Sequence, residues 1–132
     1  MLNNGEVISI YLNLGMLYFV FNLQFSFQIL QRYCRAEYSS LVTINDVNEN
    51  NWLMSKLKAN NVVYAWIGAT DCDEDKWIWA STFAPVKYSN WHSSEPNGYT
   101  KENCAAIYEK FNGKWIDSKC KIKLDYVCKR HI

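Results

Sequence analysis

The stretch from residue 66 to residue 128 contains, in order, Trp66-Ile67-Gly68, Trp77-Ile78-Trp79, Trp91, Glu95-Pro96-Asn97, Glu102-Asn103-Cys104, Trp115-Ile116-Asp117, Cys120 and Tyr126-Val127-Cys128. Cysteines and tryptophans alternate here with acidic and amide side chains. The oxygen atoms of acidic and amide groups are the ligands that hard cations such as Ca²⁺ prefer. The pattern therefore indicates a small oxidised domain that holds a hard metal ion on a surface loop.

The composition fits one folded domain. A length of 132 residues is typical of a single domain. A content of 49% hydrophobic and 20% charged residues is sufficient to bury a core. The formal net charge is +1, and the lysines are scattered apart from Lys119, Lys121 and Lys123. Nucleic-acid binding requires a clustered basic face, so this class of partner is excluded.

The chain has five cysteines, Cys34, Cys72, Cys104, Cys120 and Cys128. No Cys-x-x-Cys motif is present and there are only two histidines, which argues against a zinc site. Disulfides in an oxidising compartment are the better interpretation. An odd number leaves one cysteine that is free, bridged to another chain, or without its partner.

The N-terminal part admits three interpretations, because residues 7–31 carry no charge. The length of Val7–Leu30 fits a transmembrane helix. A signal peptide is the second interpretation, but Glu6 precedes the run and no basic residue does. The third is a soluble strand over Leu17–Phe21 and a helix over Ser26–Cys34.

Scattered Asn, Gln and Ser residues dilute the apolar run and favour the soluble interpretation. Ser26 is the expected cap of the helix, and Phe27, Leu30 and Cys34 share one face at helical spacing. Residues 1–16 remain unassigned, as a signal or anchor remnant or as part of the domain, and residues 17–132 form the predicted domain.

Further elements follow from local signals. A strand over Leu41–Ile44 precedes a helix that Asp46 caps, with Glu49 at the capping-box position. The helix runs to about Leu57. The expected buried face of this helix consists of Val47, Leu53, Met54 and Leu57. After it come a central strand over Val62–Gly68, a long loop over Ala69–Asn103, strands over Cys104–Glu109 and Lys114–Asp117 joined at Asn112-Gly113, and a last strand over Asp125–Arg130.

The chain from about Leu17 to Arg130 resembles a C-type lectin-like domain. The resemblance rests on the order and spacing of the motifs quoted first, with Cys34 at the end of the first helix. It implies an α+β fold of two helices packed on two small antiparallel sheets, with a long irregular loop. It also implies two disulfides, Cys34–Cys128 and Cys104–Cys120, with Cys72 outside both. The tryptophans of the motifs are core residues in this family.

The resemblance implies a calcium site that also binds sugar. The positions that match the family's calcium ligands are Glu95, Asn97, Glu102 and Asp117. Pro96 is commonly cis in the family, which would aim both neighbouring side chains at one point. The order Glu-Pro-Asn resembles the mannose-type members. A second, weaker metal site is expected at Asp71 and Asp75.

Ile116 departs from the family pattern. Sugar-binding members usually have Asn at this position, where its amide oxygen binds calcium and its NH₂ group donates to the sugar. Isoleucine does neither. A missing hydrogen bond to a bound hydroxyl costs on the order of 1–3 kcal/mol. Calcium accepts water in place of a lost ligand, so we expect a weakened site.

The sequence thus predicts a secreted or extracellular carbohydrate-binding module, calcium-dependent and with mannose-type preference. The alternative is a calcium-independent lectin-like domain that recognises a protein or another non-sugar surface. The expected ligand is a carbohydrate or a glycoprotein. No enzymatic motif is present, since the carboxylates converge on one metal locus rather than flanking a scissile bond. His92 and Tyr99 are candidate loop contacts, Cys72 is a candidate for a disulfide-linked dimer, and a membrane partner is expected only if the N-terminus is an anchor.

Overall fold

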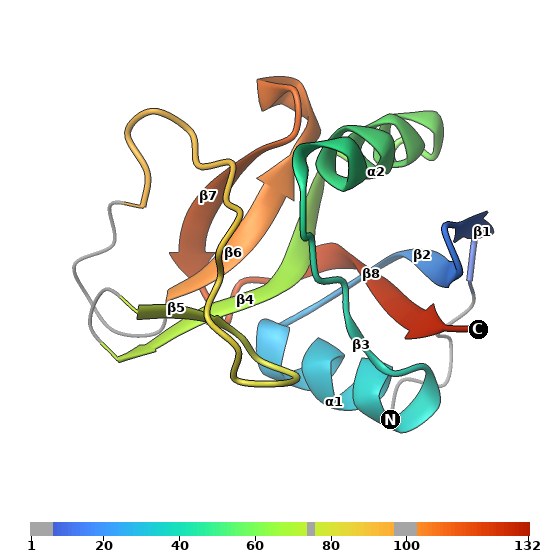
Figure 1. The fold of residues 1–132 in the computed structure, drawn as a ribbon, viewed down its shortest axis with the longest axis horizontal. Helices are drawn as coiled ribbons and strands as arrows, with labels where there is room; N and C mark the ends of the chain where they lie inside the picture. The colour runs from blue at the N-terminus through green and yellow to red at the C-terminus, as the bar shows by residue number, and fades with distance from the viewer. Residues whose placement is uncertain (1–6, 74–75, 97–102) are drawn as a thin grey trace.

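A computed structural model describes residues 7–73, 76–96 and 103–132, apart from the side chains of residues 23, 72 and 73. Its elements are β1 (Ser9–Asn13), β2 (Met16–Phe25), α1 (Phe27–Glu37), β3 (Ser40–Leu41), α2 (Val47–Ala59), β4 (Tyr64–Asp73), β5 (Lys76–Trp79), β6 (Asn103–Tyr108), a 3₁₀ turn (Glu109–Phe111), β7 (Lys114–Lys119) and β8 (Leu124–His131). Figure 1 shows the two helices on opposite sides of the strands. The α+β, C-type lectin-like arrangement is confirmed.

The strands form one connected sheet in the order β1-β2-β8-β4-β6-β7, with β3 paired to β8 and β5 paired to β4. All pairs are antiparallel except β4 with β8, where Ala65 lies opposite Asp125 and Trp66 opposite Tyr126. The resemblance led us to expect two small antiparallel sheets. This short parallel ladder joins them, because it places β4 directly beside β8.

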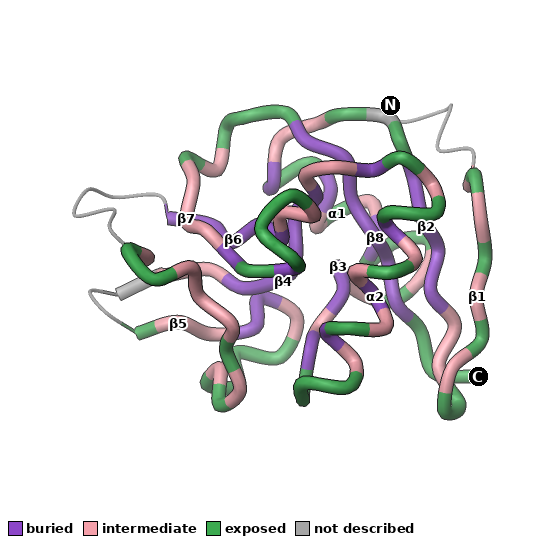
Figure 2. The backbone as a smooth tube through the Cα atoms, turned by 90° about the horizontal axis from the view of Figure 1, so that it is seen from above, coloured by how far each residue is buried: buried purple, intermediate pink, exposed green. Residues whose placement is uncertain are grey.

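The core lies on both faces of the sheet. On one face α2 contributes Leu53 and Leu57, which pack with Ile67 and Trp115. On the other face α1 contributes Phe27, Leu30 and Cys34, and these pack with Trp66 and Tyr126. Figure 2 shows the buried backbone along β2, β8, β4 and β6. The predicted buried face of the first helix is therefore confirmed.

The uncharged N-terminal run forms two strands of the sheet, β1 and β2, and the first turns of α1. The predicted strand over Leu17–Phe21 lies inside the longer β2, and β1 pairs with β2 from Ser9 to Asn13. No helix in the described part of the chain is long and apolar enough to cross a membrane. The boundary at residue 17 stays a prediction.

Ser26 occupies the cap position of α1, but its side chain makes no capping hydrogen bond. The expectation of a side-chain cap was wrong. The backbone N–H of Phe27 donates instead to the carbonyl oxygen of Cys120 at 2.9 Å. A distant segment thus satisfies one of the backbone donors in the first turn that have no partner within the helix.

The cap of α2 is confirmed, whereas its buried face differs in part. Asp46 Oδ1 accepts the Glu49 N–H at 2.8 Å, and Glu49 Oε1 accepts the Asn45 N–H at 2.9 Å. Val47 is 52% exposed, and Asn50 is fully buried in its place. An asparagine can take this position because its amide finds two buried partners, described below.

Three predicted boundaries in the middle of the chain were wrong. The regular part of the strand expected over Leu41–Ile44 ends at Leu41, although Val42 N–H still donates to the Val127 carbonyl at 2.9 Å. The central strand starts at Tyr64, since Val62 N–H closes the end of α2 on Leu57 at 2.9 Å. The loop expected from Ala69 instead begins as a hairpin, β4 with β5, and polar residues are tolerated there because both strands pair.

Both disulfides that the resemblance implies are present. Cys34 is bonded to Cys128 and Cys104 to Cys120, with sequence separations of 94 and 16 residues. In the chain-entropy model such loops stabilise the fold by about 4–5 and about 3 kcal/mol, respectively. The longer bridge ties α1 to β8.

Asn50 links α2 to β7 through buried hydrogen bonds. Its Oδ1 accepts the indole N–H of Trp115 at 2.7 Å, and its Nδ2 donates to the Gly113 carbonyl at 3.1 Å. Gly113 has φ +80°, and a Cβ at this position would lie 3.1 Å from Asn50 Nδ2. The close approach of α2 to the β6–β7 turn thus requires both residues.

We expect Asn50→Ala to lower the free energy of unfolding by about 2–4 kcal/mol, because it leaves the buried Trp115 N–H unpaired and opens a cavity. Urea denaturation measures this quantity. The matched control is Asn48→Ala, an exposed asparagine on the same helix. Equal losses for the two variants would contradict the structural role of Asn50.

Candidate functional site

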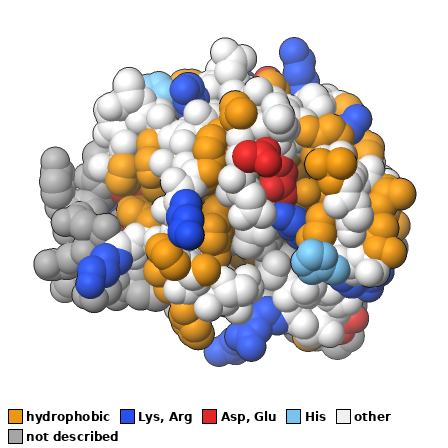
Figure 3. Space-filling view, viewed as in Figure 1, with side chains coloured by type: hydrophobic (Ala, Val, Ile, Leu, Met, Phe, Trp, Pro, Cys, Tyr) orange, Lys and Arg blue, Asp and Glu red, His pale blue; other side chains and the backbone are white. Residues whose placement is uncertain are grey.

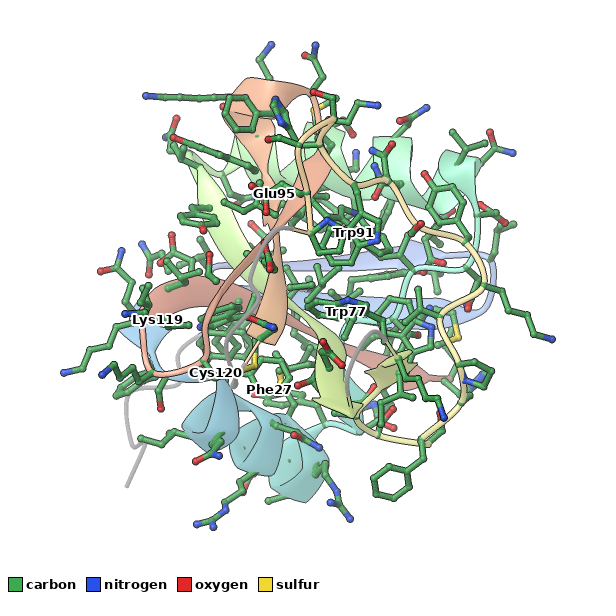
Figure 4. All side chains as sticks on the ribbon, turned by 90° about the vertical axis from the view of Figure 1, so that its left-hand side faces the viewer. Phe27, Trp77, Trp91, Glu95, Lys119 and Cys120 are labelled. Atoms are coloured by element: carbon green, nitrogen blue, oxygen red, sulfur yellow. A yellow bond between two sulfur atoms is a disulfide. The ribbon has the colours of Figure 1, made fainter. Side chains whose placement is uncertain are left out.

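The candidate site lies where the irregular segment 80–96 returns to β7. The carbonyl of Asn90 accepts the Trp115 N–H at 2.8 Å, and the Trp115 carbonyl accepts the His92 N–H at 2.8 Å. Glu95 N–H then donates to the His92 carbonyl at 2.7 Å. These bonds fix the segment on β7 immediately before Glu95. Figure 4 shows Trp91 and Glu95 on this segment, close to β7.

Tryptophan rings support this attachment. Trp91 packs edge-on against Trp77 at 4.7 Å and against Trp115 at 5.6 Å between ring centroids. Trp66, Trp79 and Trp115 are buried, whereas Trp77 and Trp91 are half-buried and pack against the core. The interpretation of most of these rings as core residues agrees with this packing.

Glu95 points toward β7. The peptide bond between Glu95 and Pro96 is cis. Glu95 Oε1 accepts the backbone N–H of Asp117 at 3.3 Å. Two of the four predicted calcium ligands, Glu95 and Asp117, are therefore neighbours in space although 22 residues separate them. Asn97 and Glu102 lie outside the described residues.

Tyr64 and Ser118 lie beside these carboxylates. The Tyr64 hydroxyl is hydrogen-bonded to Ser118 Oγ at 2.5 Å. Burial raises the pKa of the Tyr64 phenol, the bond to Ser118 opposes this shift, and the charges of Glu95 and Asp117 raise the pKa further. Both carboxylates thus act on the Tyr64 phenol and disfavour its ionisation.

The described part of the site fits a calcium ion by its chemistry. Glu95 and Asp117 supply only oxygen, the donor that calcium takes, and neither site residue is fully buried. Within residues 7–73, 76–96 and 103–132, no cluster of three or more His, Cys, Asp or Glu side chains is close enough to hold a metal. A complete calcium shell therefore needs Asn97, Glu102 or water in addition.

Ile116 lies in β7 opposite Ala106 and is half-buried. Its side chain offers no oxygen and no hydrogen-bond donor next to Asp117. The departure from the family pattern is thus located directly beside Asp117, where an amide would otherwise contribute.

Asp71, the predicted ligand of the second site, lies near the end of β4 between Trp77 of β5 and Asn103 of β6. Its Oδ1 atom is buried and has no hydrogen-bond partner among the described residues. A buried carboxylate oxygen without a donor is compatible with a cation nearby. Asp75 lies outside the described residues, so the second site stays a prediction.

The structure describes only one of the other predicted loop residues in full. His92 stacks on Phe111 with 4.5 Å between ring centroids, and it is half-buried. Tyr99 and the side chain of Cys72 lie outside the described residues. Sequence reasoning missed Tyr64 and Ser118 as neighbours of the site, because only the pairing of β4 with β6 and of β6 with β7 brings them together.

A cavity of about 720 Å³ lies elsewhere, between the start of α2 and the end of β8. Its lining includes Asp46, Glu49, Trp52, Lys129 and His131. Glu49 and Lys129 already form an ion pair there, at 2.7 Å. None of the predicted site residues lines this cavity.

Comparisons with known proteins agree with this geometry. The family model described as Lectin C-type domain matches residues 24–130. The chain belongs to the C-type lectin domain family. Human C-type mannose receptor 2 is 33% identical over 98 residues, which are 74% of this chain and 6% of that receptor. The chain thus spans only a small fraction of that relative.

Two solved structures share the fold. Human lithostathine superposes with a TM-score of 0.86 at 22% identity, over 95% of this chain and 98% of that chain. The cow C-type carbohydrate-recognition domain of CD23, solved in the presence of a GlcNAc2Man3 oligosaccharide, has a TM-score of 0.81 at 29% identity, over 95% of each chain.

We expect Glu95→Gln, measured in the presence of a chelator, to lower the pKa of the Tyr64 phenol, because it removes a negative charge that opposes the phenolate. The ¹³Cζ resonance of Tyr64, assigned with Tyr64→Phe, reports the titration. Glu37→Gln on α1 is the control and leaves that pKa unchanged. An unshifted pKa in Glu95→Gln would mean that this carboxylate does not face β7.

Proposed function

We propose that the protein is a calcium-dependent carbohydrate-binding module with mannose-type preference, and that Ile116 weakens its site. The observation that carries the proposal is the Glu95 carboxylate, which accepts the backbone N–H of Asp117 at 3.3 Å. This contact brings two family ligand positions together in a domain of the same family.

Each residue has a defined role in the proposed site. Glu95 and Asp117, with Asn97 and Glu102, would hold the ion through oxygen atoms. When bound, calcium supplies a positive centre for two neighbouring sugar hydroxyls. Glu95 and Asn97 would orient those hydroxyls by hydrogen bonds, with Glu95 accepting and the Asn97 amide donating. The hairpin of β6 and β7 keeps Asp117 in place while a ligand exchanges.

The relatives support the class of ligand. The CD23 domain was solved with an oligosaccharide that contains mannose, and the receptor that resembles this chain has mannose in its name. Two disulfides in a chain of this size favour an extracellular location. The proposal assigns no catalytic residue.

Ile116 favours a second candidate function. A domain with this side chain lacks both the amide oxygen and the amide donor beside Asp117. In that case the same surface recognises a protein or another non-sugar partner without calcium. Calorimetric titration with calcium, with and without mannose, distinguishes the two functions, since the second predicts no heat of binding in either experiment.

We expect Ile116→Asn to raise the affinity for calcium and for mannose roughly ten- to a hundredfold, corresponding to about 1–3 kcal/mol for one added ligand and one added hydrogen bond. Loss of the apolar contact of the half-buried side chain will reduce this gain. Isothermal titration calorimetry measures both affinities.

Two controls accompany this variant. Ile122→Asn makes the same chemical change at a 43% exposed position away from the site and leaves both affinities unchanged. Glu95→Gln combined with Ile116→Asn removes a carboxylate ligand and abolishes the gain. Identical affinities in the original chain and in Ile116→Asn would reject the proposed arrangement in favour of the second function.

A further inference from the structure

Strand β1 is one end of the sheet, and its outer edge is not paired with any described strand. An open edge presents backbone N–H and C=O groups to any extended chain. Most proteins protect such edges with charged residues, proline or a bulge. In this chain no charged residue and no proline occurs between residues 7 and 31, and the register of β1 with β2 is continuous.

The opposite end of the sheet is protected. Strand β7 begins at Lys114 and ends at Lys119, both exposed. At its second residue, Trp115, the backbone N–H and C=O are used for the bonds to Asn90 and His92. The same domain therefore covers and charges one edge of its sheet and leaves the other uncharged.

The side chains of β1 alternate between two environments. Ser9 and Tyr11 face α2, where Ser9 Oγ contacts Asn60 and the Tyr11 ring packs edge-on against Trp52 at 6.0 Å. This packing fixes the register, because a shift by one residue would exchange the two faces. Figure 2 shows β1 alternating between intermediate and exposed residues.

The opposite face of β1 exposes Ile10 and Leu12, and the residues that flank the strand, Ile8 and Leu14, are also exposed aliphatic side chains. Ile8 is 39%, Ile10 58%, Leu12 65% and Leu14 93% exposed. Figure 3 shows hydrophobic side chains along the right-hand edge of the molecule, where β1 lies in Figure 1. Isolated exposed leucines are common, whereas a contiguous apolar row on an open strand marks an interaction surface.

The hairpin turn determines which backbone groups point outward. Leu14 and Gly15 have φ of 51° and 79°, and Asn13 lies opposite Met16, which defines a two-residue type I′ turn. In the antiparallel alternation, Asn13 and Tyr11 then bond to β2, and the N–H and C=O groups of Leu12 and Ile10 point away from it. The residues with outward backbone groups are thus the same residues that expose aliphatic side chains.

We propose that β1 forms a two-fold symmetric homodimer by pairing antiparallel with β1 of a second copy, centred on Tyr11. In this register the backbone groups of Ile10 bond to those of Leu12 of the other copy, and the reverse. The same register sets Ile10 beside the other Leu12, and Ile8 beside the other Leu14. The edge is self-complementary in its outward backbone groups and in its aliphatic side chains, which is what an isologous contact requires.

The proposal is independent of sugar binding, since β1 and β7 are the opposite ends of the strand order and Glu95 is bonded to Asp117 of β7. Sedimentation velocity of the full chain over a range of concentrations tests it. We expect a species of twice the 15.5 kDa chain mass, with Leu12→Lys weakening the association about tenfold or more. The control Phe83→Lys changes a 73% exposed side chain outside β1 and leaves the dimer unchanged.

A mixing experiment tests the register. We expect Ile10→Glu and Leu12→Lys each to associate more weakly than the original chain when alone and to associate more strongly with each other when mixed, because the register sets position 10 of one copy against position 12 of the other. Circular dichroism and the melting temperature establish that both variants are folded, and restored association on mixing is itself evidence of folding. A chain that is monomeric at every concentration, equal association of the original chain and Leu12→Lys, or failure of the folded variants to associate on mixing would overturn the proposal.

Discussion

The hydrogen bond between the Trp115 indole and Asn50 is the contact on which the candidate site depends most directly. Both side chains are fully buried, so water cannot replace either partner. Loss of the bond therefore leaves the Trp115 indole N–H without an acceptor. The rings of Trp79, Tyr88 and Trp91 also pack edge-on against the Trp115 ring. Its backbone holds the segment that leads to Glu95. The side chain of one helix residue thereby sets the position of β7, and β7 sets the distance between Asp117 and Glu95.

Local signals in the sequence were sufficient for elements that local chemistry determines. The periodicity of Phe27, Leu30 and Cys34 and the Asp46 cap were confirmed, and the disulfides followed from the family resemblance. The errors fall where distant segments supply the partner. The Ser26 side chain makes no cap, and the start of α1 is bonded instead to the distant carbonyl of Cys120. Asn50 replaced Val47 in the buried face because Gly113 and Trp115 are within reach. For the site, the motif identified Glu95 and Asp117, but only the sheet registers identify Tyr64 and Ser118 as their neighbours.

Glu49 shows how one residue can satisfy a local signal and a distant one together. Its Oε1 atom accepts from Asn45 at the helix start, as a capping residue does. Its Oε2 atom accepts from Lys129 of β8 at 2.7 Å and from the Tyr18 hydroxyl of β2. Lys129 is 6% exposed, and its ammonium group also donates to Thr43. A buried lysine is tolerable because its donors are satisfied and its charge is paired. The spacing of Asp46 and Glu49 is visible in the sequence. The ion pair of Glu49 with Lys129, 80 residues further along, is visible only in the folded chain.

The Cys34–Cys128 bridge has a mechanical consequence. It joins the last part of α1 to the middle of β8, across a sequence separation of 94 residues. A pulling force applied between a residue of β2 and Arg130 would pass through the covalent bridge, so the enclosed strands β4, β6 and β7 would bear none of the load. Only the short stretches outside the bridge would extend under tension. Glu95 and Asp117 both lie inside the shielded segment, and a ligand held there would therefore keep its binding geometry while the chain is under strain.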